Sequence, residues 1–338
     1  MPRFRQTENS LLAKIARGSW SPDAGKSSRG TALPFDHISL GIGDDAALLR
    51  PARGCETILT CDWFLEGTHF LRDKHPADAV GWKCLARAIS DIAAMGGVPR
   101  CFLLSLALPG SATGPWLKEF LRGLRRAAKR FDCVLAGGDT TKREEILINV
   151  TVVGEVPRGR ALRRDGARVG DLLYVSGRLG EAERGLHLLR QRRGMANRRD
   201  PRLRKHLYPE PRLALGRWLV AKNLATAAMD LSDGLSSDLP RLCAASGVGA
   251  RIDAAKLPAV SLSSHAEGFQ RALHGGDDYE LLFTVPKKKA LQVPPTFAGV
   301  PLHQIGEITA TRKILLVGQN SRATDLAPQG WDPFRIRK

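Results

Sequence analysis

The stretch DAVGWKCLARAISDIAAMGGVPRCFLLSLAL, residues 78–108, decides the fold of this chain. Apolar side chains recur at helical spacing over residues 78–95, and Gly96-Gly97 with Pro99 ends the predicted helix. The short apolar run 101–108 follows and reads as a buried strand. A helix that leads directly into such a strand is typical of an α/β domain.

The same alternation extends in both directions along the chain. Strands are predicted at 56–63, 133–136, 146–153, 172–175, 279–285 and 314–317, and helices at 7–17, 116–131, 181–189, 211–222 and 234–245. The polar, glycine-rich segment 156–171 resembles a linker. We therefore expect an N-terminal domain of residues 1–155 and a C-terminal α/β domain of residues 156–338.

Composition excludes several classes of protein. Apolar residues make up 43% of the 338 residues, which is too much for a disordered chain. The mostly apolar stretch 102–108, interrupted by Ser105, is far shorter than a membrane helix requires. The polar N-terminus predicts no secretory signal. The six scattered cysteines contain no CxxC pair, which favours a reducing, cytoplasmic compartment over disulfides or zinc.

The charge is the one feature that suggests nucleic acid. The formal net charge is +18 and the pI is about 10.2, which is a common property of nucleic-acid-binding proteins. Most of the excess lies in residues 158–222, where 18 basic residues face 6 acidic ones. Its most basic part, residues 191–206, has no aromatic side chain on which a base could stack. Apart from Arg164, we interpret segment 158–222 as solvated surface, and we do not expect a nucleic-acid partner.

Two nucleotide-binding motifs are only approximated. Gly25-Lys26-Ser27 follows Gly18 by six intervening residues, whereas a P-loop has four. The sequence GIGDDA, residues 41–46, loosely matches a dinucleotide fingerprint, but its two aspartates would repel a pyrophosphate. A phosphate that approaches Asp44 and Asp45 therefore requires a divalent cation between them.

Aspartates beside small residues recur along the chain, in what we read as short turns next to apolar elements. They occur in GIGDDAA (41–47), TCD (60–62), ISD (89–91), GGDTT (137–141), MDLSDG (229–234) and GGDDYE (275–280). Each alone is an ordinary turn or helix cap. Six together predict a polyphosphate–metal site, and carboxylates without clustered cysteine or histidine favour Mg²⁺ over zinc.

In order and spacing these motifs resemble the thiamine-monophosphate kinase family, within the superfamily of aminoimidazole ribonucleotide synthetase and selenophosphate synthetase. The resemblance runs from about residue 8 to GWDPF at 330–334 and includes GIGDDAALL, TCDWFLEGTHF, AISDIAAMGGVPR, AGGDTTK, MDLSDGLSSDL and GGDDYELLFTV. It implies an N-terminal domain whose strands join a partner's in a dimeric barrel. It also implies transfer of the γ-phosphoryl group of ATP to thiamine monophosphate, which yields thiamine diphosphate.

The resemblance also implies roles for individual residues. Mg²⁺ ligands are implied at Asp45, Thr60, Cys61, Asp62, Asp91, Asp139, Asp230 and Asp233; ATP contacts at Gly138, Asp139, Arg164 and Ser232; and substrate contacts at His69, Asp277 and Trp331. Two positions depart from the family: Cys61 replaces Thr or Ser, and Asp277 replaces Glu. A thiol is a poor Mg²⁺ ligand, so we expect the backbone carbonyl of Cys61 to make any contact. His69 as a turn residue and Trp331 as a core cap remain alternatives.

No general base is expected, because a phosphate monoester is already anionic near neutral pH. Several Mg²⁺ ions would then bring two anionic substrates together. Other interpretations remain open: an aminoimidazole ribonucleotide synthetase, a Mg²⁺-dependent phosphohydrolase and a basic nucleic-acid-binding protein. A selenophosphate synthetase is a further alternative, although residues 18–35 contain Lys26 but no cysteine. The homodimer is implied by the resemblance alone.

Overall fold

The computed structural model describes residues 14–15, 37–42, 46–260, 264–318 and 322–335. Most of the helix predicted at 7–17, and the candidate ligand Asp45, lie outside the described residues. The chain divides into two compact units: unit 1 comprises residues 1–92, 98–159 and 192–198, and unit 2 the rest. In the described part of the chain, no helix is long and apolar enough to span a membrane.

Unit 1 is built on a four-stranded mixed sheet with helices on one face. The strand order is β3-β6-β4-β5, and only the β4–β5 pair is parallel. Its main elements are β3 (Cys55–Leu65), α2 (Ala77–Ala94), β4 (Val98–Leu108), α3 (Pro115–Phe131), β5 (Val134–Lys142) and β6 (Leu147–Pro157). A small two-stranded sheet pairs β1 (Ile38–Leu40) with β2 (Leu48–Leu49).

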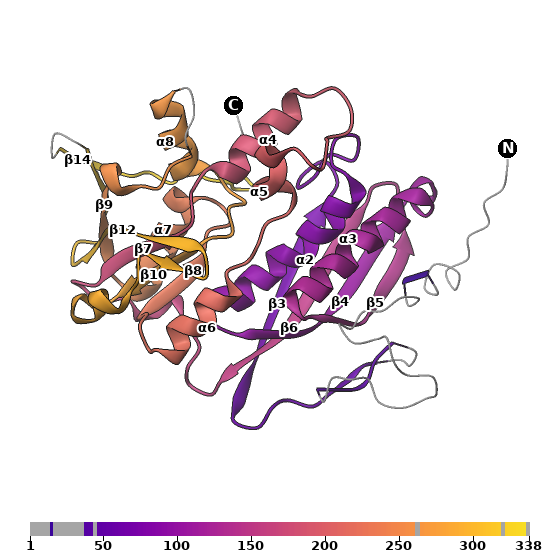
Figure 1. Cartoon of the computed structure of the whole chain (residues 1–338), viewed down its shortest axis with the longest axis horizontal. Coiled ribbons are helices and arrows are strands. Elements are labelled where there is room, and N and C mark those ends of the chain that lie inside the picture. Colours follow the sequence, from indigo (N-terminus) through magenta and orange to yellow (C-terminus); the bar gives the residue numbers. More distant parts are fainter. Residues whose placement is uncertain (1–13, 16–36, 43–45, 261–263, 319–321, 336–338) are drawn as a thin grey trace. The chain divides into compact units, whose positions relative to one another are not determined.

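Helices α2 and α3 lie side by side across these strands (Figure 1). Glycines allow this close approach: a Cβ on Gly81 would lie 2.0 Å from the Phe120 carbonyl oxygen, and one on Gly123 would lie 1.8 Å from that of Asp78. The helix-covered face of the sheet is apolar and buried, as Val150 and Val152 show. Because side chains alternate along a strand, the neighbouring positions point to the opposite face.

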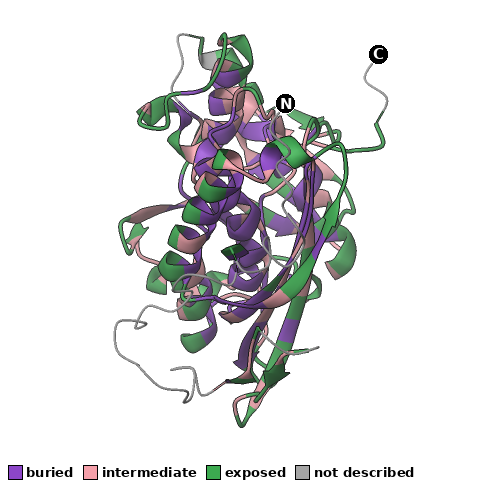
Figure 2. Cartoon of the chain, turned by 90° about the vertical axis from the view of Figure 1, so that its right-hand side faces the viewer, coloured by how far each residue is buried: buried purple, intermediate pink, exposed green. Residues whose placement is uncertain are grey.

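That opposite face, which we call the open face, carries exposed apolar side chains. Leu59 is 70%, Trp63 55% and Leu103 39% exposed. Figure 2 shows the general pattern, with buried residues where helices and strands face each other and exposed residues along outer surfaces.

Unit 2 contains an eight-stranded mixed sheet ordered β14-β13-β9-β12-β7-β10-β8, with β11 paired to β12. Its strands are β7 (Leu172–Ser176), β8 (Ala227–Asp230), β9 (Gly249–Asp253), β10 (Leu281–Val285), β11 (Thr296–Phe297), β12 (Val300–Thr309), β13 (Ile314–Val317) and β14 (Ala323–Asp325). Its helices are α4 (Glu181–Gln191), α5 (Arg204–Leu207), α6 (Leu213–Ala221), α7 (Leu235–Ser246) and α8 (His265–His274).

Both faces of the central strands of this sheet are buried. Leu173 and Val175 of β7 belong to a core cluster that includes α7 side chains, whereas Tyr174 belongs to a second cluster that includes α6 side chains. The alternation along one strand thus supplies two cores. Unit 2 is therefore a helix–sheet–helix arrangement, and unit 1 a helix–sheet arrangement, which confirms the two-domain α/β prediction.

The predicted elements are found with shifted ends, and several were missed. Strand β12 was not predicted, because Gly306 and neighbouring polar residues interrupt its apolar pattern at a bulge. Strand β9 and helix α8 were not predicted either. Strand β5 is longer than expected: it continues through the GGDTT motif to Lys142.

Candidate functional site

In unit 1, strand β3 and helix α2 bring two predicted ligands into contact. The Thr60 hydroxyl on β3 donates a short hydrogen bond to the Asp91 carboxylate on α2. These residues are 31 positions apart in the chain and meet because Thr60 lies on the helix-covered side of β3. The contact places a hydroxyl and a carboxylate together at the helix–sheet boundary.

Asp62 lies two residues further along β3, on the same face as Thr60. Its Oδ1 atom is 3.9 Å from Nη2 of Arg87, so a guanidinium faces the carboxylate at the margin of ion-pair distance. Two carboxylates and one hydroxyl are the hard oxygen donors that Mg²⁺ prefers, so the chemistry of Thr60, Asp62 and Asp91 fits this ion. Among the described residues, however, no three His, Cys, Asp or Glu side chains gather closely enough to hold a metal.

Asp139 lies on the other side of the same sheet. Cross-strand register aligns Asp62 with Val150, Leu104 and Gly138, whereas Asp139 lies in the next row, opposite Ser105. Adjacent rows point to opposite faces, and the Asp139 side chain is exposed. The structure therefore does not bring Asp139 together with Thr60, Asp62 and Asp91.

Gly138 has a structural requirement of its own. Its φ is +150°, and a Cβ there would lie 1.9 Å from the Leu104 carbonyl oxygen. Only glycine permits this approach of β5 to β4. The next residue along β5 is Asp139, and its Oδ1 accepts a hydrogen bond from the Thr140 amide at 2.8 Å.

The interpretation of the GGDTT motif as a turn is wrong, because Asp139 lies within β5. Asp62 and Asp91 lie in the strand and the helix that were predicted at 56–63 and 78–95. Residues such as Gly and Asp favour turns locally, but backbone pairing with β4 extends β5 through the GGDTT motif. The side chains consequently project from regular elements.

Cys61 and His69 are both engaged with neighbouring groups. The exposed Cys61 thiol is 3.3 Å from Oδ1 and 3.1 Å from Nδ2 of the Asn149 amide on β6. His69 accepts a hydrogen bond at Nδ1 from the Leu65 amide at 3.0 Å, and its own amide donates to the Leu65 carbonyl. His69 thus stabilises a turn through Nδ1, as the interpretation of His69 as a turn residue expects.

In unit 2, the MDLSDG motif is a turn, as predicted. Asp230 ends β8 and is buried, and Asp233 follows three residues later just before α7. The Asp233 carboxylate accepts a hydrogen bond from Nη1 of Arg241 at 2.5 Å. The same Arg241 nitrogen lies 2.8 Å from Oδ1 of Asp238, so one guanidinium links two carboxylates.

Asp238 is a functional neighbour that the sequence analysis missed. Its side chain is fully buried, and its Oδ2 accepts hydrogen bonds from the amides of Asp233 and Gly234, each at 3.0 Å. Burial, together with the charge of Asp233, raises the pKa of Asp238 to about 7. An acidic residue four positions into the helix, reaching back to the helix start, was the available signal.

The GGDDYE segment packs against this turn. The Asp277 amide donates to the Ser232 carbonyl at 2.8 Å, which joins two predicted contact residues. The Asp277 carboxylate accepts a hydrogen bond from the Tyr279 hydroxyl at 2.7 Å and lies 3.8 Å from Nδ1 of buried His206. Asp277 and Tyr279 both have positive φ, at 68° and 50°, which is costly for non-glycine residues.

Glu280 holds the end of this segment through a buried charge network. Its carboxylate is fully buried and accepts hydrogen bonds from Ser176 Oγ at 2.6 Å, Lys205 Nζ at 2.8 Å and Arg212 Nε at 2.6 Å. Burial alone would raise the pKa of Glu280, but the hydrogen bonds and charges of Arg212 and Lys205 outweigh it and lower the pKa.

This network corrects the interpretation of segment 158–222 as solvated surface for Lys205 and Arg212, whereas most other basic residues of the segment are exposed. Lys205 is 31% and Arg212 only 14% exposed, because both reach Glu280. Arg198 of the same segment faces buried Asp78 at 3.9 Å. No local pattern distinguishes these cations from their exposed neighbours, since their partners lie far away in the sequence.

Trp331 and Arg164 differ in how they are held. The Trp331 amide donates to the Asp233 carbonyl at 2.8 Å, so the C-terminal segment contacts the MDLSDG turn. Arg164 lies in a short 3-10 turn with an exposed side chain, and its carbonyl accepts a hydrogen bond from Ser246 Oγ at 2.6 Å. Trp331, Asp233, Ser232 and Asp277 are thus brought together, and Arg164 is joined to the end of α7 by its backbone.

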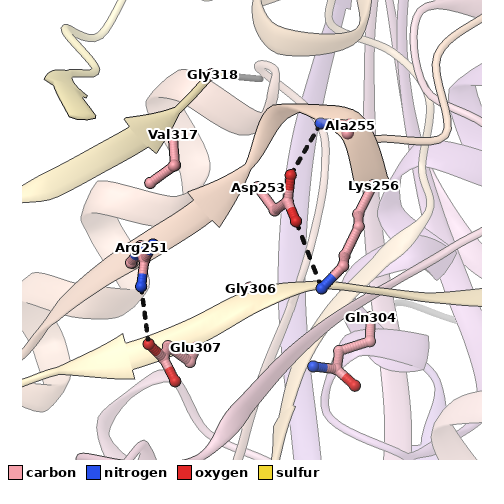
Figure 3. Close-up of a pocket in the computed structure, with 9 residues that line it drawn as sticks. All are labelled: Arg251, Asp253, Ala255, Lys256, Gln304, Gly306, Glu307, Val317 and Gly318. Atoms are coloured by element: carbon pink, nitrogen blue, oxygen red, sulfur yellow. Dashed lines mark hydrogen bonds and ion pairs between the residues drawn. The ribbon is translucent and has the colours of Figure 1, made fainter. Parts of the chain in front are cut away.

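A separate cavity of about 510 Å³ lies at β9, β12 and β13 of unit 2. It is lined by Arg251, Asp253, Ala255, Lys256, Gln304, Gly306, Glu307, Val317 and Gly318 (Figure 3). Its charges pair with one another, Arg251 with Glu307 at 3.8 Å and Lys256 with Asp253 at 3.4 Å. None of the predicted site residues lines this cavity.

Comparisons with known proteins agree along most of the chain. The family model "AIR synthase related protein, N-terminal domain" matches residues 43–156, and the corresponding C-terminal domain matches residues 168–318. The thiamine-monophosphate kinase of Escherichia coli (strain K12) is 42% identical over 305 residues, covering 88% of this chain and 92% of that protein.

Solved structures give the same result. The thiamine-monophosphate kinase of Stenotrophomonas maltophilia K279a superposes with a TM-score of 0.76 at 38% identity, covering 86% of this chain and 93% of that one. A structure described as "AaThiL complexed with AMPPCP and TMP" superposes with a TM-score of 0.73 at 33% identity, covering 87% and 92%. The chain belongs to the thiamine-monophosphate kinase family.

Proposed function

We propose that this protein transfers the γ-phosphoryl group of ATP directly to thiamine monophosphate and releases thiamine diphosphate and ADP. The observation that carries the proposal is the contact between Thr60 and Asp91 beside Asp62 in unit 1. Oxygen donors from a strand and a helix converge there in a chain whose relatives are kinases. A relative described with AMPPCP and TMP supports the two substrates.

The acceptor needs no general base from the protein. The phosphate monoester of thiamine monophosphate is already an anion near neutral pH, so its oxygen can attack the γ-phosphorus of ATP in line. The task of the protein is to hold two polyanions in this geometry against their repulsion. Rigidly held aspartates and arginines suit that task.

Several Mg²⁺ ions would supply positive charge that offsets the repulsion between the phosphate groups. In unit 1 we propose Thr60, Asp62 and Asp91 as one set of ligands, with Asp45, Asp139 and the backbone carbonyl of Cys61 as further ligands. In unit 2 we propose Asp230 and Asp233 as ligands. Arg241 pairs with Asp233 in the structure and would lose this partner when a cation binds.

The remaining residues would bind the two substrates. Gly138, Asp139, Arg164 and Ser232 are proposed ATP contacts, and His69, Asp277 and Trp331 are proposed contacts of thiamine monophosphate. The Asp277 carboxylate is held by Tyr279 and faces His206. This restraint would compensate for a side chain shorter than the family's glutamate. Residues 1–155 would then bind ATP and Mg²⁺, and residues 156–338 would complete the phosphate and substrate contacts.

We further propose that the chain forms a homodimer through the open face of unit 1. Leu59, Trp63 and Leu103 supply exposed apolar area there, and burial of such area drives association. The free thiols of all six cysteines fit the reducing cytosol that we propose as its compartment.

ADP release with and without thiamine monophosphate, at saturating Mg²⁺, tests the activity. ADP production that depends on thiamine monophosphate, with thiamine diphosphate as the product, is the expected result. Equal ADP release without the acceptor would indicate a phosphohydrolase instead. If no ADP is released with or without the acceptor, and the protein binds nucleic acid in a salt-sensitive way, it would be the basic nucleic-acid-binding protein that the +18 charge first suggests.

A further inference from the structure

The C-terminal segment of the chain is fastened to the turn that carries Asp233. We call residues 329–331 the strap, and we call residues 232–238, which include the first turn of α7, the docking loop. Three consecutive strap amides donate to this loop: Gln329 to Ser236 Oγ at 3.3 Å, Gly330 to Ser237 Oγ at 3.0 Å, and Trp331 to the Asp233 carbonyl at 2.8 Å.

Gly330 allows the strap to lie this close to the docking loop. A Cβ at residue 330 would lie 2.0 Å from the Asp233 carbonyl oxygen and 2.6 Å from Ser237 Oγ. No side chain fits in that space, so any substitution must move the strap away from the loop. The contact therefore requires a glycine at residue 330 and uses two serine hydroxyls as acceptors.

The docking loop is itself held rigidly from the inside. The fully buried Asp238 accepts hydrogen bonds from the amides of Asp233 and Gly234. Ser236 is fully buried, and its Oγ lies 2.9 Å from Nδ1 of His274. A rigid loop can position whatever is fastened to it, because its own geometry changes little.

We propose that Ser237 and Gly330 are positioning residues that fix Trp331 for binding of the thiamine ring. The inference rests on the proposed function, in which Trp331 contacts thiamine monophosphate and Asp233 binds Mg²⁺. The Asp233 carbonyl accepts a hydrogen bond from the Trp331 amide. The proposed Mg²⁺ ligand Asp233 is therefore joined directly to the residue that would contact the thiamine ring. The indole is thereby pre-organised, which lowers the ordering cost of binding.

The measurement is the Kd of thiamine monophosphate by calorimetry without ATP, together with KM for both substrates. In Ser237→Ala, loss of one hydrogen bond should weaken binding of thiamine monophosphate by roughly three- to tenfold. The KM for ATP should stay within about twofold of wild type, since Trp331 would contact only the other substrate. Ser237→Thr keeps the hydroxyl and should restore the affinity.

Two further variants separate positioning from stability. Gly330→Ala must displace the strap and should weaken binding of thiamine monophosphate by about tenfold or more. Ser264→Ala is the matched control. It removes a serine hydroxyl that accepts a hydrogen bond from the Glu267 amide at 3.3 Å, at the start of α8. It should leave the Kd unchanged.

The possible outcomes are distinct. If wild type binds thiamine monophosphate but Ser237→Ala and Gly330→Ala bind it equally well, the strap inference is wrong and the proposed function stands. A parallel loss of affinity for ATP would also overturn it, because it would indicate a general structural defect. If wild type neither binds thiamine monophosphate nor shows ADP release that depends on it, the proposed function is wrong and the strap inference falls with it.

Discussion

The two units hold their candidate site residues in opposite ways. In unit 1, Thr60, Asp62 and Asp91 project from a strand and a helix, above a sheet whose other face carries exposed apolar side chains. In unit 2, Asp233 lies in a turn held by the buried Asp238 carboxylate, and Asp277 lies in an irregular segment whose carboxylate accepts a hydrogen bond from Tyr279. Both lie beside a sheet with two buried faces. Regular elements fix a side chain by backbone pairing, whereas a turn needs specific side-chain partners.

The largest expected effect is a loss of turnover when proposed Mg²⁺ ligands in unit 1 are substituted. Asp62→Asn and Asp139→Asn should each lower kcat by at least about a hundredfold, because a neutral amide is a poor Mg²⁺ ligand. The fold should survive, since both carboxylates project from intact strands. Coupled ADP release at saturating Mg²⁺, with Tm measured in parallel, checks this.

Asp132→Asn is the control for these variants. Asp132 is exposed and has a φ of 52° at the end of α3, a conformation that asparagine tolerates. It should retain normal turnover. Near-normal rates in Asp62→Asn would remove the metal role proposed for unit 1.

The next effect is on the stability of unit 2. Glu280→Gln leaves Arg212 and Lys205 without their buried counter-charge and should cost about 3–5 kcal/mol in the free energy of unfolding. Urea denaturation measures this cost. In the control Glu307→Gln, which breaks an exposed pair with Arg251, the cost should stay below about 1 kcal/mol. Equal costs in the two variants would contradict the role of the buried network.

The open face of unit 1 gives a third test. Leu59→Arg places a charge among exposed apolar residues and should weaken the proposed homodimer by about tenfold or more. Sedimentation equilibrium should then show monomer at concentrations where wild type is dimeric. Leu291→Arg, at a fully exposed position of unit 2, should leave the dimer intact. A monomeric wild type would disprove the dimer itself.

The smallest expected effect is a pH dependence in unit 2. Burial raises the pKa of Asp278 to about 7, although the amides of Gly180 and Ala182 donate to it and the usual value is 3.8. Its folded-state pKa exceeds the unfolded one, so its stabilising contribution is complete below about pH 4 and is lost as the pH rises through 7.

Asp278→Asn removes this titration. The Tm of the variant should therefore rise relative to wild type as the pH increases from about 5 to about 7.5. Differential scanning calorimetry across that range measures the difference. In Asp325→Asn, at an exposed position, the difference in Tm from wild type should stay constant across this pH range. A constant difference in Asp278→Asn would refute the raised pKa of Asp278.

Local patterns were enough to predict much of this molecule. The helix at α2 followed by β4 was predicted from helical spacing and a glycine stop, and the MDLSDG turn from its residue types. Strand β12 was missed because its pattern is broken by a bulge between Gln304 and Gly306. The motif around Asp139 was taken for a turn, because its residues favour turns until β4 pairs with them.

By itself, the sequence determined many of the helices and strands, the motifs and the family, because periodicity, turn chemistry and motif residues can be read along the chain. Only the tertiary structure decided which residues meet. It joined Thr60 to Asp91, placed Asp139 on the opposite face from Asp62, and buried Lys205 and Arg212 against Glu280. These contacts depend on strand register and on packing between distant segments, and no local pattern encodes either.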